Sequence, residues 1–277
     1  MKVETRGNDL VLTVDDFSIS QTLECGQAFR FSSDDGVRYR GVAGRHILDC
    51  EQEGNRIVFY GMSKNDFDVF WRSYFDFDTD YAAVRRILSG DETLKSASDY
   101  AGGIRILRQD GWETICSFIF SQNNNIPRIK GIIERFCSCF GEQLDEDIFG
   151  FPSAETVEKL TVDDLAPVRS GFRAKYVIDA ARKVASKEID FDFLHTAPLE
   201  LAMQMLMKIS GVGPKVAQCA LLFGFHRIDA FPEDVWIKRV MAEYYPNGLP
   251  EFVKPYAGIA QQFLFHYIRT GQKINNH

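Results

Sequence analysis

The stretch from Met203 to Gly224 reads MQMLMKISGVGPKVAQCALLFG, and it decides the fold of the chain around it. An apolar helical run leads into Gly211 and Gly213, and Pro214, a residue favoured in the first turn of a helix, opens a second run. The pattern predicts two helices joined by a tight hairpin. Glycines let the backbone approach a ligand closely, and the second helix begins with free N–H groups and a positive dipole end. We therefore expect phosphate binding at Gly211 and Gly213, although a simple turn with a glycine cap would show a similar pattern.

Lys215 lies in the first turn of the second predicted helix, where the helix dipole disfavours a positive charge. This position favours the neutral amine, the form that a nucleophile needs, although an isolated lysine here would be an ordinary exposed side chain. Nineteen residues later, Asp234 lies in the run FPEDVWIKR, where Pro232 and Asp234 mark another helix start. An aspartate near a helix start is expected to stay ionised, and without further context it is equally well a simple N-cap.

The N-terminal part has the pattern of a small antiparallel sheet followed by helices. Apolar and polar residues alternate in short runs, which turns containing glycine separate. These runs cover residues 10–14, 38–42, 47–50 and 56–59. From Asn65 the apolar spacing becomes helical, and residues 81–88 predict a further helix.

From Asp110 onward the sequence predicts almost nothing but helix. Asp110 and Glu113 have the spacing of a capping box that opens a helix over 111–121, and Thr161 with Asp164 has the same spacing. Later segments carry apolar residues at helical spacing. They cover residues 129–140, 173–187, 197–208, 214–224, 234–244 and 255–271.

Length and composition fit one or two globular domains. The chain has 277 residues, of which 45% are hydrophobic and 26% charged, and it has no apolar run long enough for a membrane span. Its charged beginning does not resemble a signal peptide, so we expect a cytoplasmic protein, or a nuclear one in a eukaryote. The predicted fold class is α+β. A small N-terminal domain with an antiparallel sheet and helices covers 1–108, and an all-helical domain covers 109–277.

The net charge of −7 is unusual for a partner of nucleic acid, but it is unevenly distributed. Residues 1–100 hold 12 Lys and Arg against 18 Asp and Glu, whereas residues 101–277 hold 20 against 21. Residues 168–187 alone hold six basic residues and one acid. Such a stretch is most simply the solvated face of a helix, but local basic surfaces can form in this part of the chain.

Taken together, these features resemble the helix–hairpin–helix DNA glycosylase superfamily, which has a glycine-rich hairpin followed by an aspartate. The pair Lys215 and Asp234 resembles the branch with both an amine nucleophile and the aspartate, and the lack of a C-terminal cysteine cluster separates the chain from the iron–sulfur members. Three further segments resemble 8-oxoguanine DNA glycosylases in particular. They read CGQAFR at 25–30, SQNNNIPR at 121–128 and AGIAQQFLF at 257–265.

The resemblance implies how the chemistry is divided. Lys215 attacks the sugar C1′, expels the base and holds the sugar as a Schiff base, while Asp234 stabilises the positive charge on the sugar and orients the lysine. The Gly26 carbonyl accepts a hydrogen bond from the N7–H that 8-oxoguanine has and guanine lacks. Guanine would instead bring its own N7 lone pair against that buried oxygen, which is unfavourable.

The other matching residues are implied to bind the two bases. Gln261 reads the Watson–Crick edge of the flipped base, and Phe265 and Cys219 enclose its ring. Arginine suits the opposite cytosine because it only donates hydrogen bonds and cytosine N3 and O2 only accept them. The residues implied to hold this cytosine are Asn123, Arg128 and Arg173. Each residue alone also fits a plain structural role, and only their joint occurrence favours the functional one.

Three positions depart from the family pattern. Trp236 stands where a histidine is expected, Phe172 where a tyrosine is common, and Pro127 where a small residue is common. These differences bear on phosphate contact, on wedging of the duplex and on the choice of opposite base.

The leading hypothesis is a bifunctional DNA N-glycosylase and abasic-site lyase that acts on duplex DNA containing 8-oxoguanine. The damaged base leaves the stack while the hairpin holds the backbone, and β-elimination then cuts the strand. We expect no metal or other cofactor, because the amine supplies the electron sink, and we expect a monomer without membrane association. Two alternatives remain. One is a monofunctional glycosylase for alkylated bases that uses Asp234 and water, and the other is a non-catalytic DNA-binding module.

Overall fold

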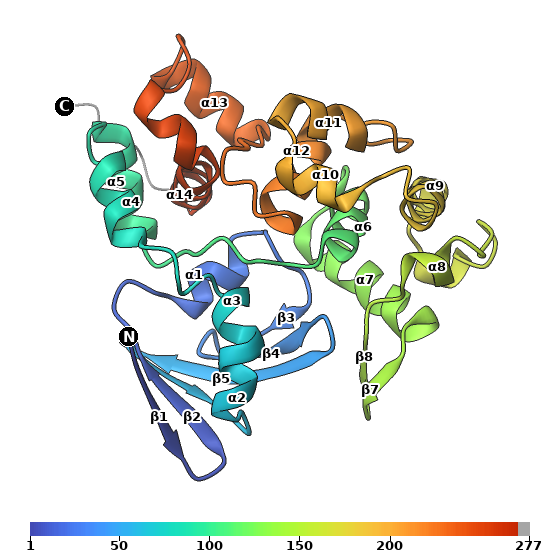
Figure 1. Ribbon diagram of the computed structural model, residues 1–277, viewed down its shortest axis with the longest axis horizontal. Coiled ribbons are helices and arrows are strands. Elements are labelled where there is room, and N and C mark those ends of the chain that lie inside the picture. The colour runs from blue at the N-terminus through green and yellow to red at the C-terminus, as the bar shows by residue number, and fades with distance from the viewer. Residues whose placement is uncertain (271–277) are drawn as a thin grey trace. The chain divides into compact units, whose positions relative to one another are not determined.

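The computed structural model describes residues 1–270, which divide by their contacts into two compact units (Figure 1). The first unit comprises 1–41, 48–108 and the chain from Ile228 onward, and the second comprises 42–47 and 109–227. The sequence predicts a different division, with one domain over 1–108 and another over 109–277. That division places the last helices of the chain in the same domain as the helices directly before them. It stays a prediction.

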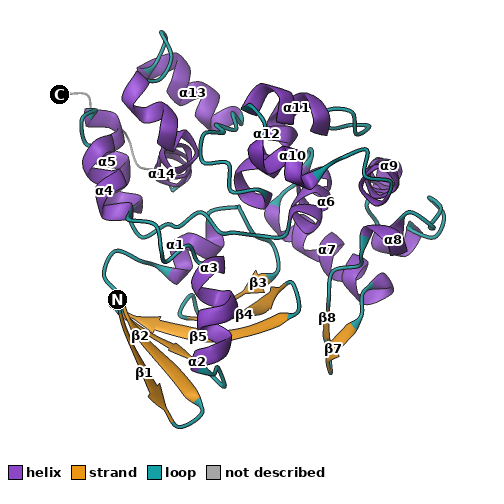
Figure 2. Ribbon diagram, viewed as in Figure 1, coloured by secondary structure: helices purple, strands orange, loops and turns teal. Residues whose placement is uncertain are grey.

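The first unit is built on a six-stranded sheet with strand order β1-β2-β6-β5-β4-β3 (Figure 2). The pairs β1–β2, β2–β6, β5–β6 and β3–β4 are antiparallel, which confirms the predicted type of sheet. The strands are β1 Lys2–Arg6, β2 Asp9–Thr13, β3 Phe31–Ser32, β4 Arg38–Ala43, β5 His46–Glu53 and β6 Arg56–Phe59. Each predicted run corresponds to a strand, whereas β1 and the two-residue β3 were not predicted.

The register of β2 against β6 explains why this sheet has a buried face. Leu10 pairs with Phe59 and Leu12 with Ile57, and all four side chains are fully buried. The Phe59 ring lies 5.9 Å from the ring of Phe67 in the helical segment that follows the sheet. Apolar residues at every second position therefore meet the helical stripe predicted from Asn65 onward.

The helices of the first unit come from both ends of the chain. They are α1 Ile19–Glu24, α2 Lys64–Asp66, the π-helical η1 Phe67–Trp71, α3 Arg72–Tyr74, α4 Tyr81–Leu88, α5 Glu92–Ala101, α13 Val235–Tyr244, the 3₁₀ segment η4 Glu251–Tyr256 and α14 Ala257–Arg269. Helix α14 is almost entirely buried and contacts α5 and α13. This burial explains why the chain after Ile228 joins the first unit.

The second unit is mostly helical. Its elements are α6 Gly111–Ser121, α7 Ile126–Phe140, β7 Gln143–Asp145, β8 Ile148–Phe149, α8 Ala154–Val157, the 3₁₀ segments η2 Ala166–Val168 and η3 Gly171–Arg173, α9 Ala174–Ala185, α10 Phe191–Thr196, α11 Leu199–Leu206 and α12 Pro214–Gly224. The sequence predicted that this part is nearly all helix, and the small hairpin β7–β8 is the exception. None of the helices described is both long and apolar enough to cross a membrane.

The two predicted capping boxes have different outcomes. The Asp110 carboxylate accepts from the Glu113 N–H at 2.8 Å and caps α6, as predicted. Thr161 and Asp164 also exchange hydrogen bonds, at 2.8 and 3.3 Å, but only the short 3₁₀ segment η2 follows them. Pro167 explains the difference, because a proline disfavours the α conformation of the residue before it.

Helices α6 and α12 pack unusually closely in the second unit. A Cβ atom added at Gly224 would lie 2.8 Å from the Thr114 side chain and 3.1 Å from the Gly111 backbone. Gly111 in turn faces the Phe225 ring, which a Cβ would meet at 2.7 Å. Glycine at both contacts brings the two backbones together, and this holds the end of α12 against the start of α6.

Candidate active site

The predicted hairpin joins α11 to α12 in the second unit. Gly211 adopts a left-handed conformation with φ of +77°, and the Val212 N–H donates to the Ile209 carbonyl at 3.0 Å. Gly213 is the extended N-cap residue of α12, and Pro214 occupies the first turn. No side chain of the described residues caps this helix start. The first N–H groups of α12 can therefore bind an anion, as the sequence predicts.

Side chains of helix α9 contact the hairpin and hold it in place. The Ser210 N–H donates to Asp179 Oδ2 at 2.7 Å, and Lys183 binds the same carboxylate at 2.9 Å. Although partial burial raises the pKa of Asp179, these hydrogen bonds lower it overall. The Tyr176 ring fills the space beside Gly211, where a Cβ would lie 2.4 Å from it. The basic stretch before the hairpin is thus more than a solvated helix face.

Lys215 is the second residue of α12, and its side chain is exposed. Its Nζ lies 5.5 Å from the centroid of the Phe118 ring in α6, and that ring stacks on Phe223 at 5.4 Å. The amine therefore lies near a pair of stacked aromatic rings and is still accessible to a substrate. Cys219 lies one turn further along α12 and is buried.

Asp234 caps α13 in the first unit, which confirms the predicted helix start. Its Oδ1 accepts from the N–H groups of Trp236 at 2.9 Å and Ile237 at 2.8 Å. The carboxylate is thereby fixed in direction at the positive end of a helix. Beside it, Trp236 is 37% exposed, and the Arg239 guanidinium lies 5.2 Å above its ring.

The predicted base-binding residues of the first unit lie close together. Gly26 has φ of +84°, and a Cβ atom there would lie 3.7 Å from Phe265 Cε1. Gln261 lies one turn before Phe265 on α14 and is buried, and its Oε1 accepts from Gln262 Nε2 at 2.8 Å. The α14 ring thus lies beside the position that a side chain at residue 26 would occupy, although the two residues are far apart in the sequence.

Gln27 was not predicted as a site residue, yet it holds the Gly26 loop. Its side chain is buried, and its Nε2 donates to the carbonyls of Thr22 at 2.9 Å and Arg105 at 2.7 Å. Its Oε1 accepts from the Leu107 N–H at 3.0 Å. A glutamine in the otherwise apolar run CGQAF was the signal available in the sequence. These bonds fix the backbone next to Gly26.

The residues predicted to hold the opposite cytosine gather at one turn of the second unit. Arg173 is buried, and its Nε donates to the Gln122 carbonyl at 2.9 Å and its Nη2 to the Asn123 carbonyl at 3.2 Å. Burial, with a smaller contribution from the positive charge of Arg128, lowers the pKa of Arg173. Asn123 is exposed and has φ of +47°. Arg173 therefore holds the turn that presents Asn123.

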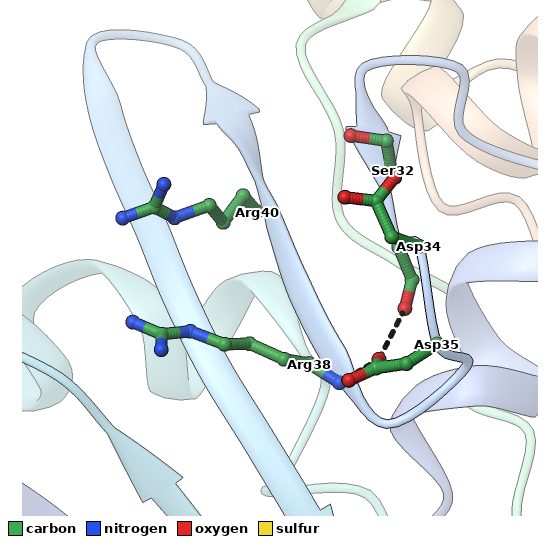
Figure 3. Close-up of a pocket in the computed structure, with 6 residues that line it drawn as sticks. Ser32, Asp34, Asp35, Arg38 and Arg40 are labelled. Carbon is green, nitrogen blue, oxygen red and sulfur yellow. Dashed lines mark hydrogen bonds between the residues drawn. The ribbon is translucent and has the colours of Figure 1, made fainter.

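A separate pocket in the first unit lies at the turn between β3 and β4 (Figure 3). Asp35 Oδ1 accepts from the Arg38 N–H at 2.9 Å, and hydrogen bonds from the backbone lower the pKa of this carboxyl. The guanidinium groups of Arg38 and Arg40 both bind Asp49, at 2.7 and 2.9 Å. Since both guanidinium groups already bind Asp49, and no predicted site residue lines the pocket, we do not assign it to the active site.

The predicted site residues are divided between the two units. Lys215, Cys219, Gly211, Gly213, Asn123, Arg128 and Arg173 belong to the second unit, and Asp234, Gly26, Gln261 and Phe265 to the first. Roles that combine residues of both units, such as the pairing of Lys215 with Asp234, stay predictions.

Comparison with known proteins assigns both parts of the chain. Residues 9–115 match the family model of the 8-oxoguanine DNA glycosylase N-terminal domain. Residues 116–249 match the model of the HhH-GPD superfamily base excision DNA repair protein. The two matches are adjacent and together cover most of the chain.

Named relatives agree with these matches. An N-glycosylase/DNA lyase of Saccharomyces cerevisiae is 37% identical over 158 residues, which are 52% of this chain and 42% of the yeast protein. The structure of MBOgg1 with a low-affinity DNA ligand is 40% identical, with a TM-score of 0.89, over 97% of this chain and 98% of that one. An 8-oxoguanine glycosylase/lyase of Clostridium acetobutylicum, bound to DNA with cytosine opposite the lesion, is 31% identical over 98% of both chains, with a TM-score of 0.89. The chain therefore belongs to the 8-oxoguanine DNA glycosylase family, within the HhH-GPD superfamily of base excision DNA repair proteins.

Proposed function

We propose that Lys215 and Asp234 carry out the chemistry of this protein, which is an 8-oxoguanine DNA glycosylase and abasic-site lyase of base excision repair. The Lys215 amine attacks C1′ of the damaged nucleotide, the base leaves with the glycosidic bond electrons, and a Schiff base then joins the enzyme to the opened sugar. Asp234 stabilises the positive charge that develops on the sugar. β-Elimination next breaks the bond to the 3′ phosphate, and hydrolysis of the Schiff base releases Lys215.

The position of the Phe265 ring beside Gly26 is the observation that best supports recognition of 8-oxoguanine. A base that stacks on the Phe265 ring would bring one edge to the Gly26 loop, where a carbonyl can accept the N7–H of the oxidised base. Gln261, one turn earlier on the same helix, reads the Watson–Crick edge in this proposal. Cys219 closes the other face of the base in this proposal.

Duplex DNA containing 8-oxoguanine is the proposed partner, bound by a protein monomer. The hairpin glycines hold a backbone phosphate at the start of α12, while Asn123, Arg128 and Arg173 hold the cytosine left behind. Burial of Arg173 in the turn that presents Asn123 supports this grouping, since it fixes the turn before DNA arrives.

Single-turnover excision of 8-oxoguanine placed opposite each of the four bases tests this function. We expect strand cleavage opposite every base from which the enzyme can flip the lesion, with the fastest cleavage opposite cytosine. We expect no cleavage at undamaged guanine. Excision of methyladenine without strand cleavage would favour the monofunctional alternative. Salt-dependent duplex binding with no turnover on any damaged base would favour the non-catalytic module.

Substitution of Gly213 by valine tests the hairpin. A Cβ atom there meets nothing within 4 Å, so the free protein should fold normally, but the new side chain would stand where a phosphate approaches α12. We expect affinity for duplex DNA to fall about tenfold for all sequences, a loss of about 1.4 kcal/mol in binding free energy. Fluorescence anisotropy with labelled duplexes measures it.

Gly211→Ala is the contrasting variant for that measurement. Its Cβ would lie 2.4 Å from the Tyr176 ring, and φ is left-handed, so this change should lower the melting temperature instead. Unchanged affinity in the Gly213→Val protein, or a fall in its melting temperature as large as that of Gly211→Ala, would argue against phosphate binding at the hairpin.

A further inference from the structure

Arg269, at the end of α14, touches both parts of the proposed base pocket in the first unit. Its Nη2 donates to the carbonyl of Glu24, the last residue of α1, at 2.6 Å. Its guanidinium carbon lies 5.4 Å from the centroid of the Phe265 ring. One side chain thus joins the helix that carries the ring to the helix that leads into Gly26.

Both contacts suit an arginine at this position. The carbonyls in the last turn of a helix lack partners within that helix, and the negative end of its dipole attracts a cation. Phe265 and Arg269 are four residues apart on α14, so they share one face of the helix. A planar guanidinium can stack on the ring and donate to the carbonyl at the same time, which a lysine ammonium cannot do.

Gly26 lies between the two residues that Arg269 contacts. Glu24 is two residues before Gly26, and the glycine itself is in reach of Phe265, where an added Cβ would lie 3.7 Å from Cε1. Gln27 fixes the inner side of the same loop through the carbonyls of Thr22 and Arg105. Gln27 therefore sets the conformation of the loop, and Arg269 sets its distance from the ring.

We propose that Arg269 is a positioning residue for 8-oxoguanine, which holds the Gly26 loop at the distance from Phe265 that lets carbonyl and ring bind the oxidised base together. This inference rests on the function proposed above. Arg269 itself does not touch the reacting atoms. Its loss leaves Lys215 and Asp234 in place but loosens the pocket that selects the base.

Two activities measured on the same protein test this role. Excision of 8-oxoguanine needs the base pocket, whereas cleavage at a preformed abasic site needs only the amine and the sugar. For Arg269→Met we expect kcat/KM for 8-oxoguanine excision to fall about tenfold or more, since small displacements of a binding group have effects of this order. Cleavage of a preformed abasic site should stay within about twofold of wild type.

Two further variants complete the test. Arg269→Lys should recover part of the excision rate, because an ammonium can still donate to the Glu24 carbonyl but does not stack on the ring. Arg6→Met removes one positive charge from an exposed position on β1 and should change neither activity. If the methionine variant is unfolded at the assay temperature, the lysine variant gives the same comparison.

The outcomes separate this inference from the function on which it rests. Lack of 8-oxoguanine excision by the wild-type protein would remove the proposed function itself. Given an active wild type, unchanged excision by Arg269→Met would overturn the positioning role. Equal losses of excision and abasic-site cleavage in folded variants would overturn it too, because they would reflect a general structural effect.

Discussion

Replacing Lys215 with glutamine is expected to abolish both the excision of 8-oxoguanine and the cleavage of abasic sites. Only an amine can form the Schiff base, so rates should fall on the order of a thousandfold or more. Borohydride reduction during the reaction should trap a covalent protein–DNA adduct with the wild-type protein and none with the variant. Because the side chain is exposed at the start of α12, binding to duplex DNA and the melting temperature should hardly change.

Lys159→Gln is the matched control. This lysine is also exposed and lies in the second unit, in the turn after α8, away from every predicted site residue in the sequence. The variant should form as much trapped adduct as the wild type. A trapped adduct that persisted in Lys215→Gln would assign the Schiff base to another amine and remove the central claim about position 215.

The hairpin and its second helix could be predicted from the sequence because their signals are local. Pro214 and Gly224 mark the two ends of α12, and the structure begins and ends the helix at these residues. Strand β6 likewise matches the alternating run from Arg56 to Phe59. In each case the residues that determine the element are the residues within it.

The assignment of the last helices to the first unit could not be predicted in this way. It depends on the burial of α14 against α5, and on bonds such as that from the Tyr245 hydroxyl to Asp91 Oδ1 at 2.6 Å. No periodicity within 257–269 specifies which earlier segment will cover the helix. The strands β7 and β8 were missed for a related reason, since runs of two or three residues carry too little alternation to be recognised.

The site residues show the same difference between local signals and contacts from distant parts of the chain. Residues whose proposed roles are tied to a motif, such as Gly26 and Gln261, could be predicted from the resemblance. Gln27 and Arg269 were not predicted, because the roles proposed for them come from bonds to backbone carbonyls. The carbonyl that Arg269 binds lies 245 residues earlier in the chain, and a carbonyl has no side chain to mark it in a sequence.

Asp234→Asn is expected to separate the catalytic charge of this residue from its role as a helix cap. Asparagine caps a helix as well as aspartate does, so it can still accept from the N–H groups of Trp236 and Ile237. We expect the free energy of unfolding to change by less than about 0.5 kcal/mol, since the cap is retained. Excision of 8-oxoguanine should nevertheless fall about a hundredfold to a thousandfold, because a neutral amide cannot stabilise the positive charge on the sugar.

Asp190 offers a control with nearly the same local geometry. It caps α10, and its Oδ1 accepts from the N–H groups of Asp192 at 3.0 Å and Phe193 at 3.3 Å. Asp190→Asn makes the same chemical change at a helix start that has no proposed part in the reaction, so excision should be unchanged. Asp234→Ala should lose the cap as well as the charge and cost about 1 kcal/mol of stability. If Asp234→Asn retained wild-type excision in single-turnover assays, Asp234 would be a cap alone, and the positive charge on the sugar would have to be stabilised by another group.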